Sequence, residues 1–317
     1  MTDSPAYLDE PIHDSSGGRK LIRQIRFVCG MAVAAAIFWH FGLWAAKPLD
    51  PHGPITLLVV DQGVVGMAEL LGLAVIASGL ATAICGGGAS DRGPLAIAVG
   101  LATLNLRGTE MDSLLLYRMT TLRAGQTAAD IFPTWGLIAE TWLWLALIAV
   151  GFVVGRWVDS WFAQEGNPAA LKNLLRPSDF RQALGTMALG SIVAWCVVSF
   201  TLGNERYSLQ KGQIYFSVAV AFMFGALVAH WFFQRTSKVW LMLTVAVVAT
   251  AAYVFGSPSV AALESAQKAG IYINLRSIVR PLPIEFAAMG AIGALLEQDA
   301  MNVLRAMFGI QPDEEPA

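Results

Sequence analysis

The sequence predicts an all-α membrane protein, a polytopic helical bundle with about eight transmembrane spans. Hydrophobic residues make up 56% of the 317-residue chain and charged residues only 14%, whereas a soluble domain carries about 25% charged residues. The apolar residues are also concentrated in long runs, such as "FPTWGLIAETWLWLALIAVGFVVGRW" at 132–157. Such a run is long enough to cross a bilayer, which takes about 20 mostly apolar residues.

Eight apolar segments are candidates for spans, and helices are expected because a lone membrane segment must satisfy its own backbone hydrogen bonds. The segments are 27–46, 62–85, 94–106, 133–156, 183–202, 213–233, 239–256 and 281–296. The third is short, and two arrangements remain open for it. It continues toward Tyr117 as a tilted helix, or it enters and leaves the membrane on the same side. The eighth is also short and rich in Ala and Gly.

Basic residues predict the orientation of the spans, because short cytoplasmic loops carry an excess of Lys and Arg. With eight crossings, the basic flank at 19–26 and the connection at 157–182 both lie in the cytoplasm. We therefore expect a multi-pass inner-membrane protein with both termini cytoplasmic. The predicted divisions are a polar tail with its basic flank (1–26), a first four-span half (27–156), the connection (157–182), a second four-span half (183–297) and a C-terminal segment (298–317).

The order of elements in the first half recurs in the second. Each half has two spans joined by a short outer loop, a tight inner turn, a third span, a long outer segment and a last span. That last span begins near a proline and carries a glutamate, Glu140 or Glu285. An even number of spans in each unit would make the halves parallel repeats. Because residue identity between them is negligible, duplication and coincidence explain this layout equally well.

The long outer segments are predicted to contain helices of their own. Residues 109–123 place Met111, Leu115 and Met119 on one helical stripe, which predicts an amphipathic helix. Residues 257–270 predict a second helix that starts near Pro258 and ends at Gly270.

Four ionisable residues inside the predicted spans are the candidate ion- or proton-binding residues: His40, Glu69, Glu140 and Glu285. All four fall in the outer third of their spans. The first three lie on helical faces built mainly from small residues, which mark close contacts between helices, so their side chains are predicted to point into the bundle. Glu285 ranks below them because its face carries larger side chains.

Two interpretations of these residues remain open. A carboxyl group in a low-dielectric bundle favours its protonated form and can exchange a proton near neutral pH. His40 would then share or relay that proton. Alternatively, each group is a hydrogen-bonded packing residue or reaches the membrane interface, where a charge costs much less than at mid-span.

Other classes of site lack support in the sequence. The three cysteines lie in apolar runs without CxxC spacing, so neither a disulfide framework nor a structural zinc site is expected. A net charge of −2 provides no attraction to nucleic acid. The glycine-rich stretch "CGGGAS" at 85–90 is not followed by GK[ST], so it is interpreted as a turn and not as a phosphate-binding loop. No catalytic motif such as GxSxG or HExxH is present, so no catalytic residue, cofactor or metal is predicted.

Three functions remain compatible with the sequence. Transport of a proton, a cation or a small solute past the buried glutamates is the leading hypothesis. The alternative is a non-catalytic accessory or scaffold subunit of a larger membrane complex. A membrane-embedded lipid-modifying enzyme, with His40 or the Glu110–Asp112 pair as acid–base groups, is the third. The expected partners are the lipid bilayer and either further copies of the chain or other membrane subunits.

Overall fold

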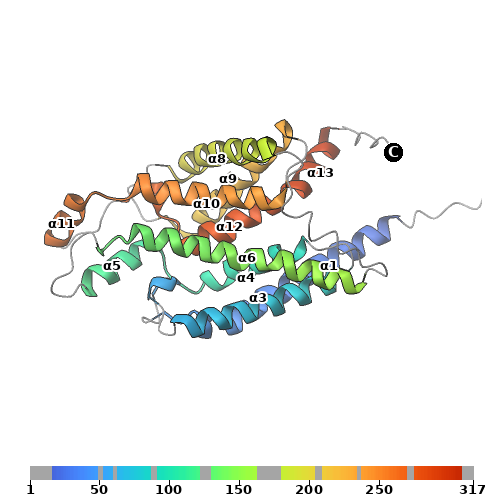
Figure 1. Cartoon of the computed structure of the whole chain (residues 1–317), viewed down its shortest axis with the longest axis horizontal. Helices are drawn as coiled ribbons and strands as arrows, with labels where there is room; N and C mark the ends of the chain where they lie inside the picture. The colour runs from blue at the N-terminus through green and yellow to red at the C-terminus, as the bar shows by residue number, and fades with distance from the viewer. Residues whose placement is uncertain are drawn as a thin grey trace, which may run out of the picture.

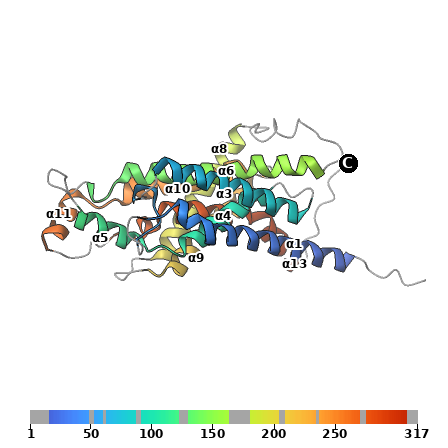
Figure 2. The ribbon, with the colours of Figure 1, turned by 90° about the horizontal axis from the view of Figure 1, so that it is seen from below.

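The computed structural model of the protein is an elongated bundle whose helices run along one long axis (Figure 1, Figure 2). It describes residues 16–48, 53–59, 63–86, 91–121, 130–162, 180–203, 209–233, 237–269 and 275–308. Helices are the regular elements of these ranges, and no strand occurs among them. The predicted all-helical class is confirmed for this part of the chain.

Six helical stretches of the described residues are long and apolar enough to cross a membrane. The first is formed by α1 (Ser16–Ile37), which continues through the π-helical turn η1 (Phe38–Gly42) into α2 (Leu43–Ala45). The other five are α3 (Gly63–Cys85), α6 (Thr134–Phe162), α8 (Phe180–Leu202), α9 (Lys211–Phe232) and α10 (Lys238–Gly256). They match six of the eight predicted spans, most of them within three residues at each end.

The third and eighth predicted spans correspond to shorter helices. These are α4 (Arg92–Asn105, 14 residues) and α12 (Pro283–Leu295, 13 residues). At 1.5 Å per residue each is about 20 Å long, against a hydrocarbon core of about 30 Å. Eight helices of full spanning length are therefore not present in the described residues.

The two short helices form the centre of the bundle. α4 packs against α1, α3 and α6, α12 packs against α6, α9 and α10, and α4 and α12 contact each other. The large apolar side chains that are exposed lie on the surrounding helices, for example Ile76, Ile192 and Phe224, and none of those described belongs to α4 or α12. An apolar exterior around a buried centre is the arrangement expected in lipid, where apolar side chains need not be covered.

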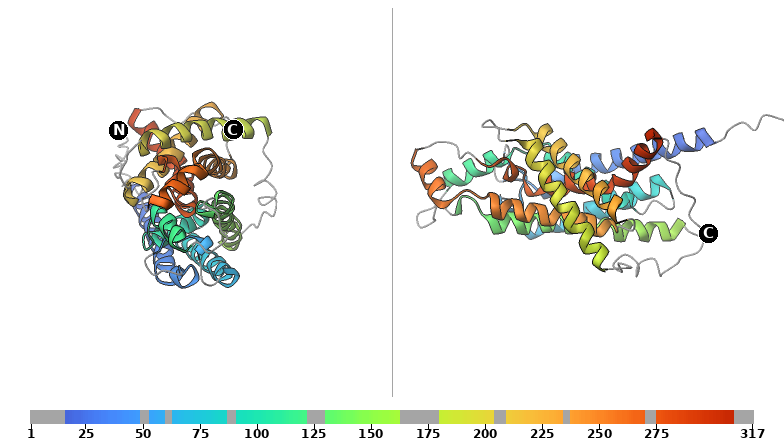
Figure 3. Two further views of the ribbon diagram at one scale, coloured as in Figure 1. Left: turned by 90° about the vertical axis from the view of Figure 1, so that its left-hand side faces the viewer. Right: turned by 90° about the horizontal axis from the view of Figure 1, so that it is seen from above.

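The two halves of the chain have the same pattern of neighbours. In the first half the contacting pairs are α1–α3, α1–α4, α3–α4, α3–α6 and α4–α6. In the second half they are α8–α9, α8–α10, α9–α10, α9–α12 and α10–α12. The end-on view of Figure 3 shows the two groups side by side. They meet through α4–α12, α6–α12 and α6–α10.

Glycines allow the central helices to touch neighbouring backbones. A Cβ atom on Gly93 of α4 would overlap the carbonyl oxygen of Gly151 in α6. A Cβ atom on Gly293 of α12 would likewise overlap the carbonyl oxygen of Ala219 in α9. Small residues at such contacts let membrane helices approach closely enough for backbone-to-backbone packing.

Three further helices lie at the ends of the bundle. α5 (Met111–Thr121) and α11 (Val260–Ala269) lie together at one end, and α13 (Glu297–Phe308) lies toward the other (Figure 1). We refer to these as the α5–α11 end and the α13 end. The predicted helix within 109–123 is confirmed, with Met111 and Leu115 buried.

The second predicted outer helix starts slightly later than expected. α11 begins at Val260, and the hydroxyl of Ser259 accepts a hydrogen bond from the backbone N–H of Ala262 at 3.3 Å. The predicted terminator Gly270, the tail at 1–15 and most of the 157–182 connection lie outside the described residues.

Candidate functional site

The structure separates the four candidate residues into two buried and two exposed. Glu140 is 2% exposed and Glu285 is completely buried, whereas His40 and Glu69 are exposed on the outside of the bundle. The predicted inward orientation is therefore correct for Glu140 and wrong for His40 and Glu69. Glu285, ranked last from the sequence, is the most buried of the four because helices surround α12 on every side.

Glu285 is positioned by the way α12 begins. Pro283 is the first helical residue, and the carboxylate of Glu285 folds back to accept a hydrogen bond from the backbone N–H of Leu282 at 2.8 Å. The backbone N–H of Glu285 in turn donates to the Leu282 carbonyl at 2.9 Å. This reciprocal arrangement satisfies backbone groups that a helix start leaves unpaired. It also holds the carboxylate at one place inside the bundle.

Two other helices supply further partners of Glu285. The side-chain amide of Asn105, at the end of α4, donates to Glu285 Oε1 at 2.9 Å and to the hydroxyl of Tyr215 at 2.9 Å. Tyr215, on α9, donates its own proton to the carbonyl of Ala102 at 2.9 Å. The carboxylate is therefore held by groups from α4 and from the start of α12, with α9 completing the network.

Lys211 places a positive charge beside this network. Its ammonium group donates to the backbone carbonyl of Asn105, and it interacts electrostatically with both Glu285 and Glu110. Lys211 and Tyr215 are four residues apart on α9 and so share one face of that helix. We call the group formed by Asn105, Lys211, Tyr215 and Glu285 the Glu285 site.

A narrow crevice at the α5–α11 end contains further charged groups. Glu110, Asp112 and Arg280 line it together with apolar side chains. Asp112 and Lys211 both interact electrostatically with Glu110. Burial raises the pKa of Asp112, and the positive charge of Arg280 opposes this shift. Lys211 interacts electrostatically with both Glu110 and Glu285. It therefore connects the charged groups of the crevice with the Glu285 site.

Glu140 has a different set of partners. Its carboxylate accepts hydrogen bonds from the Thr56 hydroxyl at 2.5 Å, the Leu57 backbone N–H at 2.8 Å and the Trp144 indole N–H at 2.9 Å. Thr56 and Leu57 belong to a mainly non-helical segment, 53–59, that ends in the 3₁₀ turn η2 (Leu57–Val59). Glu140 therefore fastens this segment to α6.

Glu140→Ala is expected to release segment 53–59 and to lower the free energy of unfolding by about 2–4 kcal/mol, because each buried donor left unpaired costs roughly 1–3 kcal/mol. Hydrogen exchange of the amides in 53–59 and thermal unfolding in detergent would measure the two effects. Glu264→Ala, which changes an exposed carboxylate on α11, is the control. Unchanged exchange at Leu57 in Glu140→Ala would contradict the fastening role.

Tyr253 connects the surroundings of the two buried glutamates. Its hydroxyl donates to the carbonyl of Pro281 at 2.7 Å, and its ring packs edge-on against Phe286 at 5.8 Å between centroids. It also interacts electrostatically with both Glu140 and Glu285. The two carboxylates thus flank one buried aromatic side chain, although neither shares a hydrogen-bonding partner with the other.

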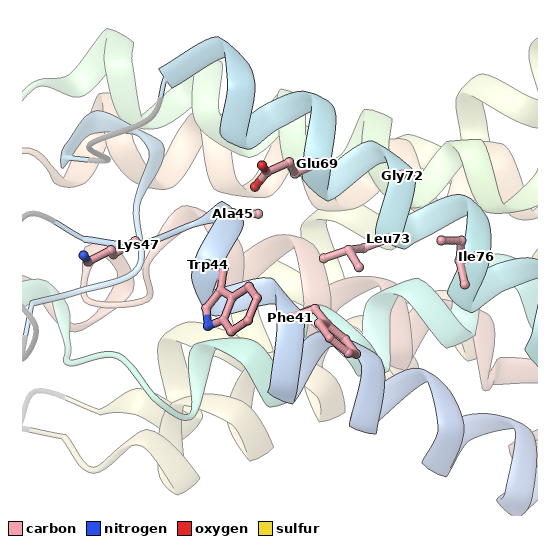
Figure 4. A pocket seen from close by; sticks show the side chains of 8 residues that line it. All are labelled: Phe41, Trp44, Ala45, Lys47, Glu69, Gly72, Leu73 and Ile76. Carbon is pink, nitrogen blue, oxygen red and sulfur yellow. The ribbon is translucent and has the colours of Figure 1, made fainter.

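Glu69 lies in a groove on the exterior between α2 and α3 (Figure 4). His40 belongs to the π-helical turn η1 and is exposed. Neither residue has a described contact with the Glu285 site.

Three members of the Glu285 site were not predicted from the sequence: Asn105, Lys211 and Tyr215. The one local signal was the spacing of Lys211 and Tyr215, which puts a cation and a phenol on the same face near the start of a span. Among the described residues, no group of three or more His, Cys, Asp or Glu side chains is placed to hold a metal ion. The described cysteines, Cys29, Cys85 and Cys196, are all free thiols.

Comparison with protein-family models, with curated proteins and with solved structures found no match to this chain.

Proposed function

We propose that this chain is a membrane transporter that moves protons by way of Glu285, with a small cation or solute as the coupled or alternative cargo. One observation carries the proposal. A completely buried carboxylate lies at the centre of the bundle, where it is hydrogen-bonded by Asn105 and lies close to the ammonium group of Lys211.

The chemistry of this arrangement suits reversible protonation. Burial opposes the charge on Glu285, whereas two hydrogen-bond donors and a nearby cation favour it. Opposing influences of this kind allow a carboxyl group to exist in two protonation states. Ionisable groups inside membrane bundles commonly mark the path of an ion or proton. The crevice lined by Glu110, Asp112 and Arg280 is closed to water in this structure, so proton entry from the α5–α11 end requires it to open.

The arrangement of the halves supports a transporter architecture. We infer that the chain crosses the membrane eight times. The third and eighth crossings are made by the two short helices with adjoining segments: α4 with the following residues 106–110, and α12 with the preceding residues 275–282. Non-helical backbone at membrane depth is tolerated where protein surrounds it. The matching neighbour patterns support two four-element parallel repeats about an axis normal to the membrane, as transporter halves can be. Glu140 and Glu285 then lie on corresponding helices, α6 and α12.

Basic residues support an inner-membrane location with both termini in the cytoplasm. Arg23 and Arg26 lie in the first turns of α1, Arg92 starts α4 and Lys238 starts α10, all near the α13 end. Because positive residues are retained on the cytoplasmic side, the α13 end is assigned to the cytoplasm and the α5–α11 end to the outside.

Glu285→Gln is expected to reduce proton flux to the level of protein-free vesicles, since the amide keeps the size of the side chain but cannot bind and release a proton at neutral pH. The measurement uses purified protein in proteoliposomes with an imposed pH gradient and an entrapped pH-sensitive dye. Glu264→Gln, on the exposed face of α11, is the matched control and should retain the flux of the unmodified chain.

Equal flux from Glu285→Gln and the unmodified protein would remove Glu285 from the proton path. Failure of the unmodified protein to exceed empty vesicles, with gradients of H⁺, Na⁺ and K⁺ tested in turn, would instead favour the accessory-subunit alternative. Native mass spectrometry after mild extraction would then identify a partner subunit.

A further inference from the structure

We propose that the groove between α2 and α3 binds an aminophospholipid, with its primary ammonium group on Glu69, its phosphate on Lys47 and an acyl chain along the apolar lining. The groove has a volume of about 610 Å³ and is lined by eight residues. These are Phe41, Trp44, Ala45, Lys47, Glu69, Gly72, Leu73 and Ile76. This volume falls within the roughly 300–1,000 Å³ typical of small-molecule sites.

The charges of the groove are separated from its apolar part along the membrane axis. Figure 4 shows Lys47 nearest the α5–α11 end, then Glu69 beside Trp44, and finally Leu73 and Ile76 farther along α3. A phospholipid has the same polarity, with its headgroup at the interface and its acyl chains directed toward the bilayer centre. The order of these residues therefore matches the order of chemical groups in a lipid of the leaflet at that end.

Within the described part of the chain, neither charged residue of the groove has a compensating partner. No hydrogen bond or ion pair joins Glu69 or Lys47 to any other residue that the structure describes. Glu69 lies six residues after the start of α3, about 9 Å along the helix, and its side chain is exposed on the lipid-facing exterior. A charge facing hydrocarbon is costly unless it is paired. An ammonium group and a phosphate would pair both residues through charge-assisted hydrogen bonds.

The wall opposite Glu69 is aromatic and departs from regular helix geometry. Phe41 and Trp44 are 51% and 70% exposed and pack edge-on, with centroids 6.3 Å apart. Phe41 belongs to the π-helical turn η1, and such turns often occur at functional sites because they redirect side chains. Trp is favoured at the membrane interface, where one part of its ring system is apolar and another is polar.

The size of the groove favours a lipid chain over a transmembrane helix. A helix with its side chains is about 10–12 Å across, so the groove would hold only about one turn of it. The lining extends along α3 from Glu69 to Ile76, which is about 10 Å, and a helix of that length would need a larger space. A flexible, thinner acyl chain fits the volume.

The test measures which lipids the purified full-length protein retains. The protein is delipidated in mild detergent, mixed with equal amounts of phosphatidylethanolamine and phosphatidylglycerol, and analysed by native mass spectrometry. Both lipids carry a phosphate, but only the first carries an amine. We expect preferential retention of phosphatidylethanolamine, and we expect Glu69→Gln to lower the ratio of the two bound lipids about fivefold, the effect of one partly exposed ion pair.

Two further variants separate the phosphate and acyl-chain contacts. Lys47→Gln should weaken retention of both lipids equally. Gly72→Phe should displace the bound lipid, because nothing lies within 4 Å of a Cβ atom at this position and the ring can enter the groove. Ala83→Phe, at an exposed position of α3 about 16 Å away along the helix, adds a similar volume and should leave retention unchanged.

Unchanged lipid ratios in Glu69→Gln together with unchanged retention in Gly72→Phe would overturn the proposal. Conversion of a dimer to a monomer by Gly72→Phe, without loss of lipid, would also overturn it and assign the groove to contacts between copies of the chain. Thermal unfolding of each variant confirms that the protein is folded. The proton-flux assay is independent of this result, because Glu69 has no described contact with the Glu285 site.

Discussion

Gly293→Val is expected to prevent the second half of the bundle from assembling. Any Cβ atom at this position overlaps the carbonyl oxygen of Ala219 and approaches the backbone N–H of Met223 at 3.0 Å. The obstacle is helix backbone, which no rotamer change can move aside. α9 and α12 would have to separate, and the cost exceeds the roughly 1–3 kcal/mol that overpacking by a methylene group carries in an ordinary core.

The separation would also break the Glu285 site, since Lys211 and Tyr215 come from α9 and Glu285 from α12. The expected readout is loss of the monodisperse peak in size-exclusion chromatography of the fluorescently tagged protein. Gly72→Val is the matched control, because no atom lies within 4 Å of a Cβ atom there. Recovery of folded Gly293→Val with an unchanged unfolding temperature would show that α9 and α12 do not pack backbone to backbone.

The all-helical class and the six described helices that are long and apolar enough to cross a membrane were predictable from the sequence, because both depend on local composition. An apolar run of about 20 residues forms a helix in lipid whatever its neighbours are, since its backbone has no other hydrogen-bonding partners. The predicted span 62–85 and the observed α3 (Gly63–Cys85) differ by one residue. The shortness of 94–106 was visible as well, but its position at the centre of the bundle was not, because that depends on which helices surround it.

The orientation of His40 was predicted wrongly because the small-residue face of the first span does not contact another helix. Cys29 and Ala36, which share that face with His40 on a regular helix, are exposed as well. Both precede the π-helical turn at Phe38–Gly42, so the face already points outward in α1. Small side chains on an apolar helix therefore do not by themselves identify its buried side.

Glu69 also lies on an exposed face, and small residues beside it leave open space. Small residues mark close helix contacts, yet Gly72, one turn away, has open space around it. The buried face of α3 instead carries Leu70, Ala74 and Ala77. A small residue leaves room for a neighbouring helix and for a lipid groove alike, so its presence does not identify which of the two lies there.

The Glu285 site depends on residues that are far apart in the chain. Asn105 is 180 residues from Glu285 and 110 residues from Tyr215. No local pattern pairs them, and they meet only because two short helices cross the middle of the bundle. The low rank of Glu285 arose because its larger neighbours suggested a lipid-facing side, whereas α12 is apolar all round, as a fully surrounded helix is.

The two buried glutamates have distinct environments, although their helices α6 and α12 have matching neighbours within the two halves. Glu140 accepts three hydrogen bonds, two of them from segment 53–59, and so acts as an anchor. Glu285 has a cation nearby and connects through Lys211 to a charged crevice. If the halves arose by duplication, the two carboxylates have since acquired different hydrogen-bonding partners.

Glu285→Ala is expected to destabilise the protein by about 2–4 kcal/mol, whereas Glu285→Gln should cost less than half of that. The alanine variant removes the acceptor of the Leu282 N–H and of one Asn105 N–H bond, and it leaves a cavity in a fully packed helix interface. Lys211 would also lose its nearest buried countercharge. The glutamine variant keeps the side-chain volume and one of the two acceptor oxygens, so it retains the packing and one of the two hydrogen bonds.

Comparing these two variants separates a structural role of Glu285 from its proposed role in proton exchange. Thermal and chemical unfolding in detergent measure stability, and the vesicle assay measures flux on the same preparations. We expect both variants to lose flux but only Glu285→Ala to lose substantial stability. Equal destabilisation by the two substitutions would show that the negative charge itself holds α4, α9 and α12 together. In that case loss of flux in Glu285→Gln would reflect a loosened bundle, and Lys211→Met, which removes the opposite charge, would reproduce it.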